Sequence, residues 1–157
     1  MDDSLLRALH ARRPAIRRQW ESLLRLEKPA NGLAHPDTLV RMIDWTLDEA
    51  FAALGQPRKR GRARGGHPPS YECVRRACGC GRNPLIEYFL AGERALLEAL
   101  VLAQAEVPAD SPASHHSTAT EVHLVVRHIA EREVRLFCSI CQMKNDASRH
   151  SATPALT

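Results

Sequence analysis

The sequence predicts an all-α protein, a single helical bundle of four to five helices. Leu, Ala, Arg and Glu are abundant, β-branched residues are sparse and aromatic residues make up 4% of the 157 residues, a composition typical of helices rather than sheets. Apolar residues also recur at three- and four-residue steps in several long stretches. Capping residues and prolines stand where those stretches begin and end. Together these observations favour one hydrophobic core and one domain.

The first predicted helical stretch runs from Leu5 to Leu26, with Ser4 as its cap. Pro14 interrupts it, because an interior proline loses a backbone hydrogen bond and clashes with the preceding turn. The sequence leaves open whether two short helices meet there or one helix kinks. Trp20 is expected to pack in the core or in an interface.

A second stretch follows a connection over 28–36. Asp37 is its expected cap, and Gly55 followed by Pro57 ends it. Trp45 is the second large packing residue that we expect in the core or in an interface. The predicted buried side of this helix consists of Leu39, Val40, Ile43, Leu47, Ala50 and Leu54.

A third helix is predicted from Asn83-Pro84, where Asn83 reads as the cap and proline occupies the first helical position. Its apolar stripe comprises Leu85, Phe89, Gly92, Leu96 and Leu100. A Pro/Ser-rich linker over 107–118 comes next, and Thr120 is the expected cap of a last helix. That helix carries Val122, Val125, Val126, Ile129, Leu136, Phe137 and Ile140. The bundle domain is therefore expected over 1–145, with a disordered tail over 146–157.

A basic run divides the chain at 56–70, which we expect to be a mobile loop of the domain. Five positive charges, with no aromatic residue between them, form a candidate patch for phosphate or an acidic partner: Arg58, Lys59, Arg60, Arg62 and Arg64. A solvated loop of like charges is the simpler interpretation. Nucleic-acid binding is the alternative function, and it would be directed to the backbone and sensitive to salt.

The last two helices are predicted to pair antiparallel, because the link between them is short. With the turn centred near Pro112, equal counting along both helices places Pro84 beside Ile140. Cys138 and Cys141 then lie next to the turn that holds Cys78 and Cys80. Five cysteines scattered over the chain would converge on one end of the bundle.

Four interpretations of these cysteines remain open. Four thiolates suit a tetrahedral zinc ion, with Cys78, Cys80, Cys138 and Cys141 as ligands and Cys73 or His67 as substitutes. The same residues suit an iron–sulfur cluster or a dithiol–disulfide switch. They also suit inert packing, because cysteine is among the most frequently buried residue types.

Other classes of protein are disfavoured by the sequence. It contains no phosphate-binding glycine loop, nucleophile elbow or His-Glu-x-x-His motif, so we expect no enzyme activity. No apolar run approaches the ~20 residues that span a bilayer, and no signal peptide is recognised. We therefore expect a cytoplasmic protein with no membrane partner.

The order of these features resembles the N-terminal sensory or regulatory domain of the RsbT co-antagonist (RsbRD-type) family. The residues that carry the resemblance are Ile16–Trp20-Glu21 with Leu23-Leu24, the 39–54 helix, Arg75-Arg76 with Gly81, Leu85-Ile86-Glu87-Tyr88, and Glu93-Arg94-Ala95-Leu96. The resemblance implies an all-helical bundle that signals through protein contacts without catalysis, commonly attached to an output module. The cysteine cluster and the basic loop are additions to that pattern.

Taken together, the sequence predicts a non-catalytic regulatory or sensor module that binds a protein partner. Its cysteine end would hold a metal ion, zinc before an iron–sulfur cluster, or would act as a redox switch. Apolar helix surface beyond the core also leaves a homodimer open.

Overall fold

The computed structural model describes residues 1–26, 35–56, 83–107 and 112–150, with side chains over 1–26, 35–56, 83–107 and 115–140. All regular structure in these ranges is helical, which confirms the all-α prediction. Five of the described helices have nine residues or more, in agreement with the predicted bundle of four to five helices. The elements are α1 (Asp3–Ala11), α2 (Arg13–Leu26), α3 (Pro36–Leu39), a 3₁₀ turn (Val40–Met42), α4 (Ile43–Gly55), α6 (Pro84–Glu106) and α7 (Pro112–His150).

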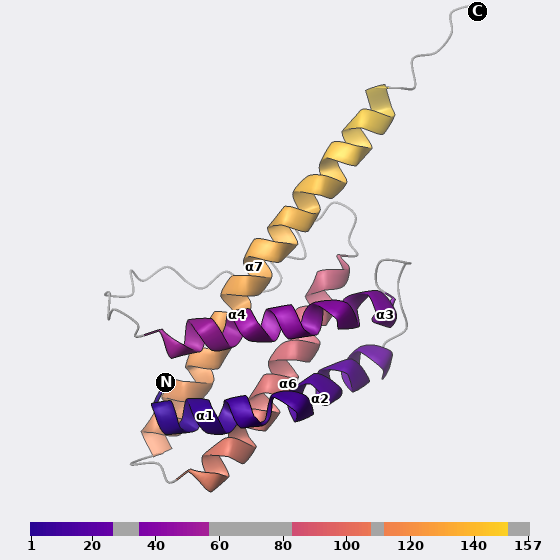
Figure 1. The fold of residues 1–157 in the computed structure, drawn as a ribbon. Coiled ribbons are helices and arrows are strands. Elements are labelled where there is room, and N and C mark those ends of the chain that lie inside the picture. Colours follow the sequence, from indigo (N-terminus) through magenta and orange to yellow (C-terminus); the bar gives the residue numbers. More distant parts are fainter. Residues whose placement is uncertain (27–34, 57–82, 108–111, 151–157) are drawn as a thin grey trace, which may run out of the picture.

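Two long helices form the frame of the bundle. Helices α6 and α7 lie side by side, and α1, α2 and α4 cross them on one side (Figure 1). Helix α2 packs mainly on α6, and α4 packs mainly on α7. One continuous core therefore draws side chains from all five long helices.

The N-terminal stretch consists of two helices, with the break just before Pro14. Helix α1 ends at Ala11 and α2 begins at Arg13, because proline has no N–H to continue the helical ladder. The expected cap Ser4 is wrong by two residues. Asp2 is the cap, and its Oδ1 accepts hydrogen bonds from the backbone N–H of Ser4 at 2.9 Å and of Leu5 at 3.3 Å.

The second stretch starts two residues before its expected cap. His35 caps α3, Pro36 takes the first helical position and Asp37 lies in the first turn, because proline fits a helix start that needs no N–H. A 3₁₀ turn then leads into α4. The predicted apolar side is buried, with Val40 only partly so: Leu39, Ile43, Leu47, Ala50 and Leu54.

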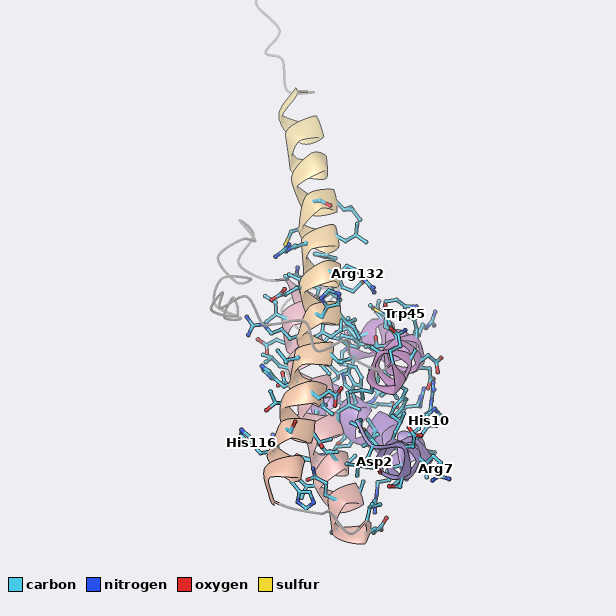
Figure 2. The ribbon with its side chains drawn as sticks, turned by 90° about the vertical axis from the view of Figure 1, so that its left-hand side faces the viewer. Asp2, Arg7, His10, Trp45, His116 and Arg132 are labelled. Carbon is cyan, nitrogen blue, oxygen red and sulfur yellow. The ribbon has the colours of Figure 1, made fainter. Side chains whose placement is uncertain are left out.

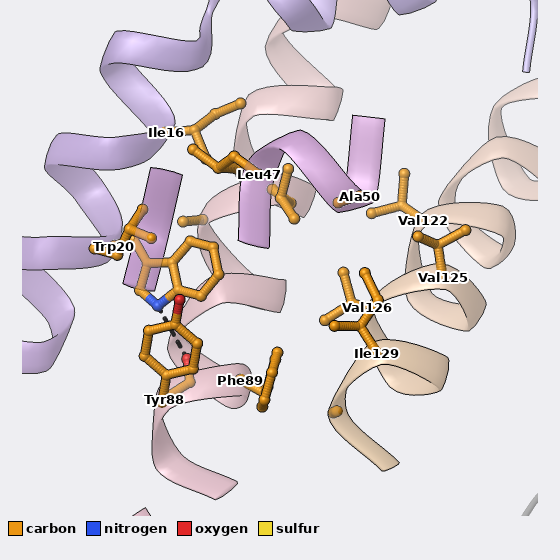
Figure 3. Close-up of a cluster of buried hydrophobic side chains, with 14 of the residues drawn as sticks. Ile16, Trp20, Leu47, Ala50, Tyr88, Phe89, Val122, Val125, Val126 and Ile129 are labelled. Carbon is orange, nitrogen blue, oxygen red and sulfur yellow. Dashed lines mark hydrogen bonds between the residues drawn. The ribbon is translucent and has the colours of Figure 1, made fainter. Parts of the chain in front are cut away.

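The centre of the core is the contact between Trp20 and α6. The indole is fully buried, and its Nε1 donates a hydrogen bond to the Tyr88 carbonyl at 3.0 Å (Figure 3). Gly92 lies directly beneath the ring, where a Cβ atom would stand only 2.5 Å from Trp20 Cε2. Because Gly92 has no side chain, it leaves room on the predicted stripe for the Trp20 indole.

Helix α7 begins earlier than predicted. It starts at Pro112, so Thr120 lies inside the helix and donates its hydroxyl to the His116 carbonyl at 3.0 Å. The expected linker over 107–118 is wrong in its second half, since Thr118 and Val122 are buried against the bundle and hold this part helical. The helix also continues through 146–150, which the sequence assigned to a tail.

Within the described ranges, no helix combines the length and the apolar character that crossing a bilayer requires.

Candidate functional site

The α6–α7 pair is antiparallel, and three contacts fix its register. Gln104 donates to the His115 carbonyl at 3.2 Å, His123 pairs with Glu93, and Asn83 contacts Cys138. The sequence predicted this direction but set Pro84 beside Ile140. The register differs by a few residues because the turn between the helices is shorter than the predicted linker.

Asn83 joins the start of α6 to α7 through both atoms of its side-chain amide. Its Oδ1 accepts from the backbone N–H of Leu85 at 3.0 Å, which caps the helix as predicted. Its Nδ2 donates to the Val134 carbonyl at 3.4 Å and to Cys138 Sγ at 3.3 Å. Asn83 is 4% exposed and Cys138 is 6% exposed, so the contact is shielded from solvent.

Cys138 is therefore held at the point where the cysteine-bearing segment joins α6. It is a buried thiol with no disulfide partner among the described residues. No group of three or more His, Cys, Asp or Glu side chains that suits a metal ion occurs in that part of the chain. The described contacts of Cys138 are thus those of a packed thiol that accepts a hydrogen bond.

The remaining members of the predicted cysteine site fall outside the described side chains. Cys141 lies on α7, one turn after Cys138, with only its backbone described. Outside the described residues are Cys73, Cys78, Cys80 and His67, together with the basic patch Arg58, Lys59, Arg60, Arg62 and Arg64.

A polar seam runs between α6 and α7 toward the middle of the pair. His123 on α7 pairs with Glu93 on α6, and Arg127 donates to Glu131 at 3.1 Å within α7. Arg127 is largely buried. The His123–Glu93 pair therefore joins the two helices, whereas the Arg127–Glu131 pair lies within α7.

A second surface surrounds Trp45, and here the structure differs from the sequence interpretation. Trp45 is 47% exposed, so it does not lie in the core, while the interface that the sequence offered as the alternative stays a prediction. The Arg132 guanidinium of α7 lies over its ring, with Cζ 5.9 Å from the centroid (Figure 2). Leu136 and Ile140, which the sequence placed on the core stripe of α7, are 56% and 46% exposed. We call the surface formed by Trp45, Arg132, Leu136 and Ile140 the Trp45 face.

Arg132 is held by two carboxylates at this face. It donates two hydrogen bonds to Glu49, at 2.5 and 2.7 Å, and one to Glu133 at 2.8 Å. The hydrogen bonds from Arg132 lower the pKa of Glu49 and raise the pKa of Arg132 itself. Both partners stay charged at neutral pH and offset each other's charge.

The sequence misplaced Leu136 and Ile140 because the buried side of α7 shifts along its length. At the Cys138 end the bundle covers Val134 and Cys138, four residues apart. Position 136 is two residues from both, and position 140 is two residues beyond Cys138; a two-residue step is about 200° around a helix. Arg132 and Arg135 flanking this stretch were the available signal that one of its sides faces outward.

The chain matches no family model, no curated protein and no solved structure. The structure is an all-α bundle with a buried thiol at one end and an exposed apolar face beside that thiol. The function is therefore argued from these residues.

Proposed function

We propose that the chain is a non-catalytic cytoplasmic regulatory module that binds a protein partner, and that its cysteine end holds a metal ion or responds to thiol oxidation. The single observation that supports this proposal is the buried contact between Asn83 and Cys138. It ties α7 to the residue at which the segment carrying Cys78 and Cys80 enters the bundle.

Chain length limits how far these cysteines lie from Cys138. Three peptide steps separate Cys80 from Asn83, and three residues span at most about 11 Å. Cys141 follows Cys138 by three residues, which puts the two positions about 60° apart around the helix. Two cysteines on one helix turn and two on the adjoining segment are an arrangement typical of structural zinc sites.

Zinc is the metal that we favour, with Cys78, Cys80, Cys138 and Cys141 as ligands. Cys73 and His67 would substitute if one of them is not used. An iron–sulfur cluster fits the same thiolates less well, because Cys-x-Cys spacing is unlike the common cluster motifs. In the redox form of the proposal, two thiols give up two electrons and two protons to a peroxide-class oxidant, which is reduced to water.

The resemblance to RsbT co-antagonist N-terminal domains supports the protein-partner part of the proposal. In that family the helical domain acts by contacts with other proteins. A change in metal load or thiol state at one end of the bundle would reach a partner through α6 and α7, which the Asn83 contact joins.

Metal content is the direct test. We expect about one equivalent of zinc per chain in protein purified without chelators, measured by elemental analysis. Cys138→Ser should lower it strongly. Val134→Ala is the matched control, since it disturbs the same buried neighbourhood but removes no thiol.

The redox form has its own measurement. Thiol titration before and after mild peroxide treatment should show the loss of two thiols in the wild type and not in Cys138→Ser. Metal far below one equivalent, together with an unchanged thiol count, would remove the sensor part of the proposal and leave a helical adaptor.

A further inference from the structure

Helix α7 is much longer than the helix it pairs with. It has 39 residues against 23 in α6, and Asn83 at the start of α6 lies beside Val134 and Cys138. The following 12 residues, 139–150, therefore project about 18 Å beyond that point. Figure 1 shows this end of α7 extending away from the other described helices.

We propose that this chain forms a homodimer, in which the projecting end of α7 in each copy packs on the Trp45 face of the other copy. The proposal concerns a homodimer interface and does not depend on the cysteine chemistry proposed above.

The first argument is the exposed apolar area. Single exposed apolar residues are ordinary, whereas a contiguous group marks an interaction surface. Leu136 and Ile140 are one helical turn apart on α7, and Arg132 links that row to Trp45 on α4. These residues come from two helices that meet at the contact between Arg132 and Trp45.

The second argument is the sequence of the projecting helix. Met143 and Ala147 follow Leu136 and Ile140 at steps of three and four residues. A narrow apolar row with this spacing is typical of a helix that packs on another helix. Figure 1 shows this end of α7 away from the other described helices, so its apolar row is available to a partner.

The third argument is charge. Arg132 pairs with Glu49 and Glu133, so these three residues carry one net negative charge. The projecting residues 139–150 carry one net positive charge, from Lys144 and Arg149 against Asp146. The two surfaces therefore carry small opposite charges, and each also presents an apolar row to the other when two copies pair. Nucleic acid gains nothing from such a surface. The chain's own 57–82 segment has eight Lys or Arg against one acidic residue, and its only large apolar residues are Tyr71 and Val74, so it offers little to cover an apolar face.

A two-fold symmetric dimer covers both the Trp45 face and the projecting end of α7. In an antiparallel arrangement, the projecting end of each α7 lies along the Trp45 face of the other copy. Each chain supplies one surface and one helix, and the interface closes on itself. A second copy supplies both the helix and the face that the two features require, which is the property of a self-complementary two-fold interface.

The test compares two leucines of equal exposure. Leu136 and Leu102 are both 56% exposed, and Leu102 lies on α6 outside the Trp45 face. Sedimentation equilibrium of the wild type and of Leu102→Glu should give twice the chain mass of 17.5 kDa. Leu136→Glu should raise the dimer dissociation constant about tenfold or more, because it places a charge in the apolar interface. Circular dichroism checks that both variants remain helical.

Tryptophan fluorescence reports on the face directly. The chain has two tryptophans, and Trp20 is fully buried, so acrylamide quenching follows Trp45. Quenching should increase on dilution of the wild type and should be high at all concentrations in Leu136→Glu. A wild type that is monomeric up to about 100 μM, far above the dissociation constants of specific dimers, overturns the proposal. A monomer whose Trp45 is protected also overturns it, since the 57–82 segment would then cover the face. Equal dimerisation of Leu136→Glu and Leu102→Glu overturns it as well.

Discussion

At the scale of single residues, the bundle depends on a glycine that makes room for a ring. Gly92 lies on the apolar stripe of α6, where glycine is a poor helix former. The indole of Trp20 occupies the space that a Cβ atom would take and is fixed there by its hydrogen bond to the Tyr88 carbonyl. Close packing of this kind tolerates no added atom.

Gly92→Ala should therefore destabilise the protein, although alanine is the better helix former. We expect the free energy of unfolding to fall by about 2 kcal/mol, because the overpacking cost exceeds the gain in helix propensity of about 1 kcal/mol. Urea denaturation of the wild type and of Gly92→Ala measures this difference in the free energy of unfolding.

Gly55→Ala is the control for that experiment. A Cβ atom there would lie 3.4 Å from Leu6 Cδ2, an ordinary contact. The change should have no effect or stabilise by up to about 1 kcal/mol. A Gly92→Ala protein as stable as wild type would mean that Trp20 does not lie on α6 as described.

At the scale of the elements, the start of α6 is tied to α7 by one amide. Asn83 caps α6 with its oxygen and bonds to α7 with its nitrogen. The sequence shows the cap, because Asn before Pro is a helix-start signal. Nothing local shows the second role, which exists only because α7 passes beside the cap.

Asn83→Asp separates the two roles. Aspartate caps a helix as well as asparagine does, so capping alone predicts no loss of stability. The new carboxylate oxygen would instead face the Val134 carbonyl, which cannot donate, and Cys138, whose thiol is only a weak donor. We expect a loss of about 2 kcal/mol in the free energy of unfolding.

The matched control is the reverse substitution, Asp to Asn, at the cap of α1. Asp2→Asn alters the solvent-exposed cap of α1, whose Oδ1 accepts from Ser4 and Leu5, and it should change stability by less than about 0.5 kcal/mol. Equal effects of the two exchanges would argue that Asn83 is only a cap.

At the scale of the whole molecule, Tyr88 joins three helices in the core. Its carbonyl accepts from Trp20 on α2, and its hydroxyl shares a 2.8 Å hydrogen bond with Thr46 on α4. The ring packs against Trp20 and Phe89. Burial raises the pKa of Tyr88 well above its ordinary value of 10.0, so the folded protein keeps this hydroxyl protonated when the unfolded chain ionises it.

Alkaline pH should therefore weaken the fold through Tyr88. The contribution of Tyr88 is fully present below pH 10 and declines above it, where the unfolded state binds fewer protons than the folded state. The decline approaches about 1.4 kcal/mol per pH unit. Tyr88→Phe should cost about 1 kcal/mol at pH 7 through the lost hydrogen bond to Thr46, and its stability should decline less steeply above pH 10.

Urea denaturation between pH 8 and 11 gives both quantities. Tyr71→Phe, which alters the only other tyrosine, is the control and should retain the wild-type slope. Parallel pH profiles for all three proteins would show that Tyr88 is accessible to ionisation in the folded state.

The sequence by itself determined the helical class, an interruption near Pro14, the start of α6 at Asn83-Pro84 and the antiparallel direction of α6 and α7. These depend on local backbone chemistry and on the 3.6-residue period, which adjacent residues express. Only the tertiary structure decided which side of each helix is covered. It exposed Trp45, Leu136 and Ile140, set Gly92 under Trp20 and placed Asn83 on Cys138. Burial of a side chain depends on where a neighbouring helix crosses and ends, and that is fixed by contacts between residues far apart in the sequence.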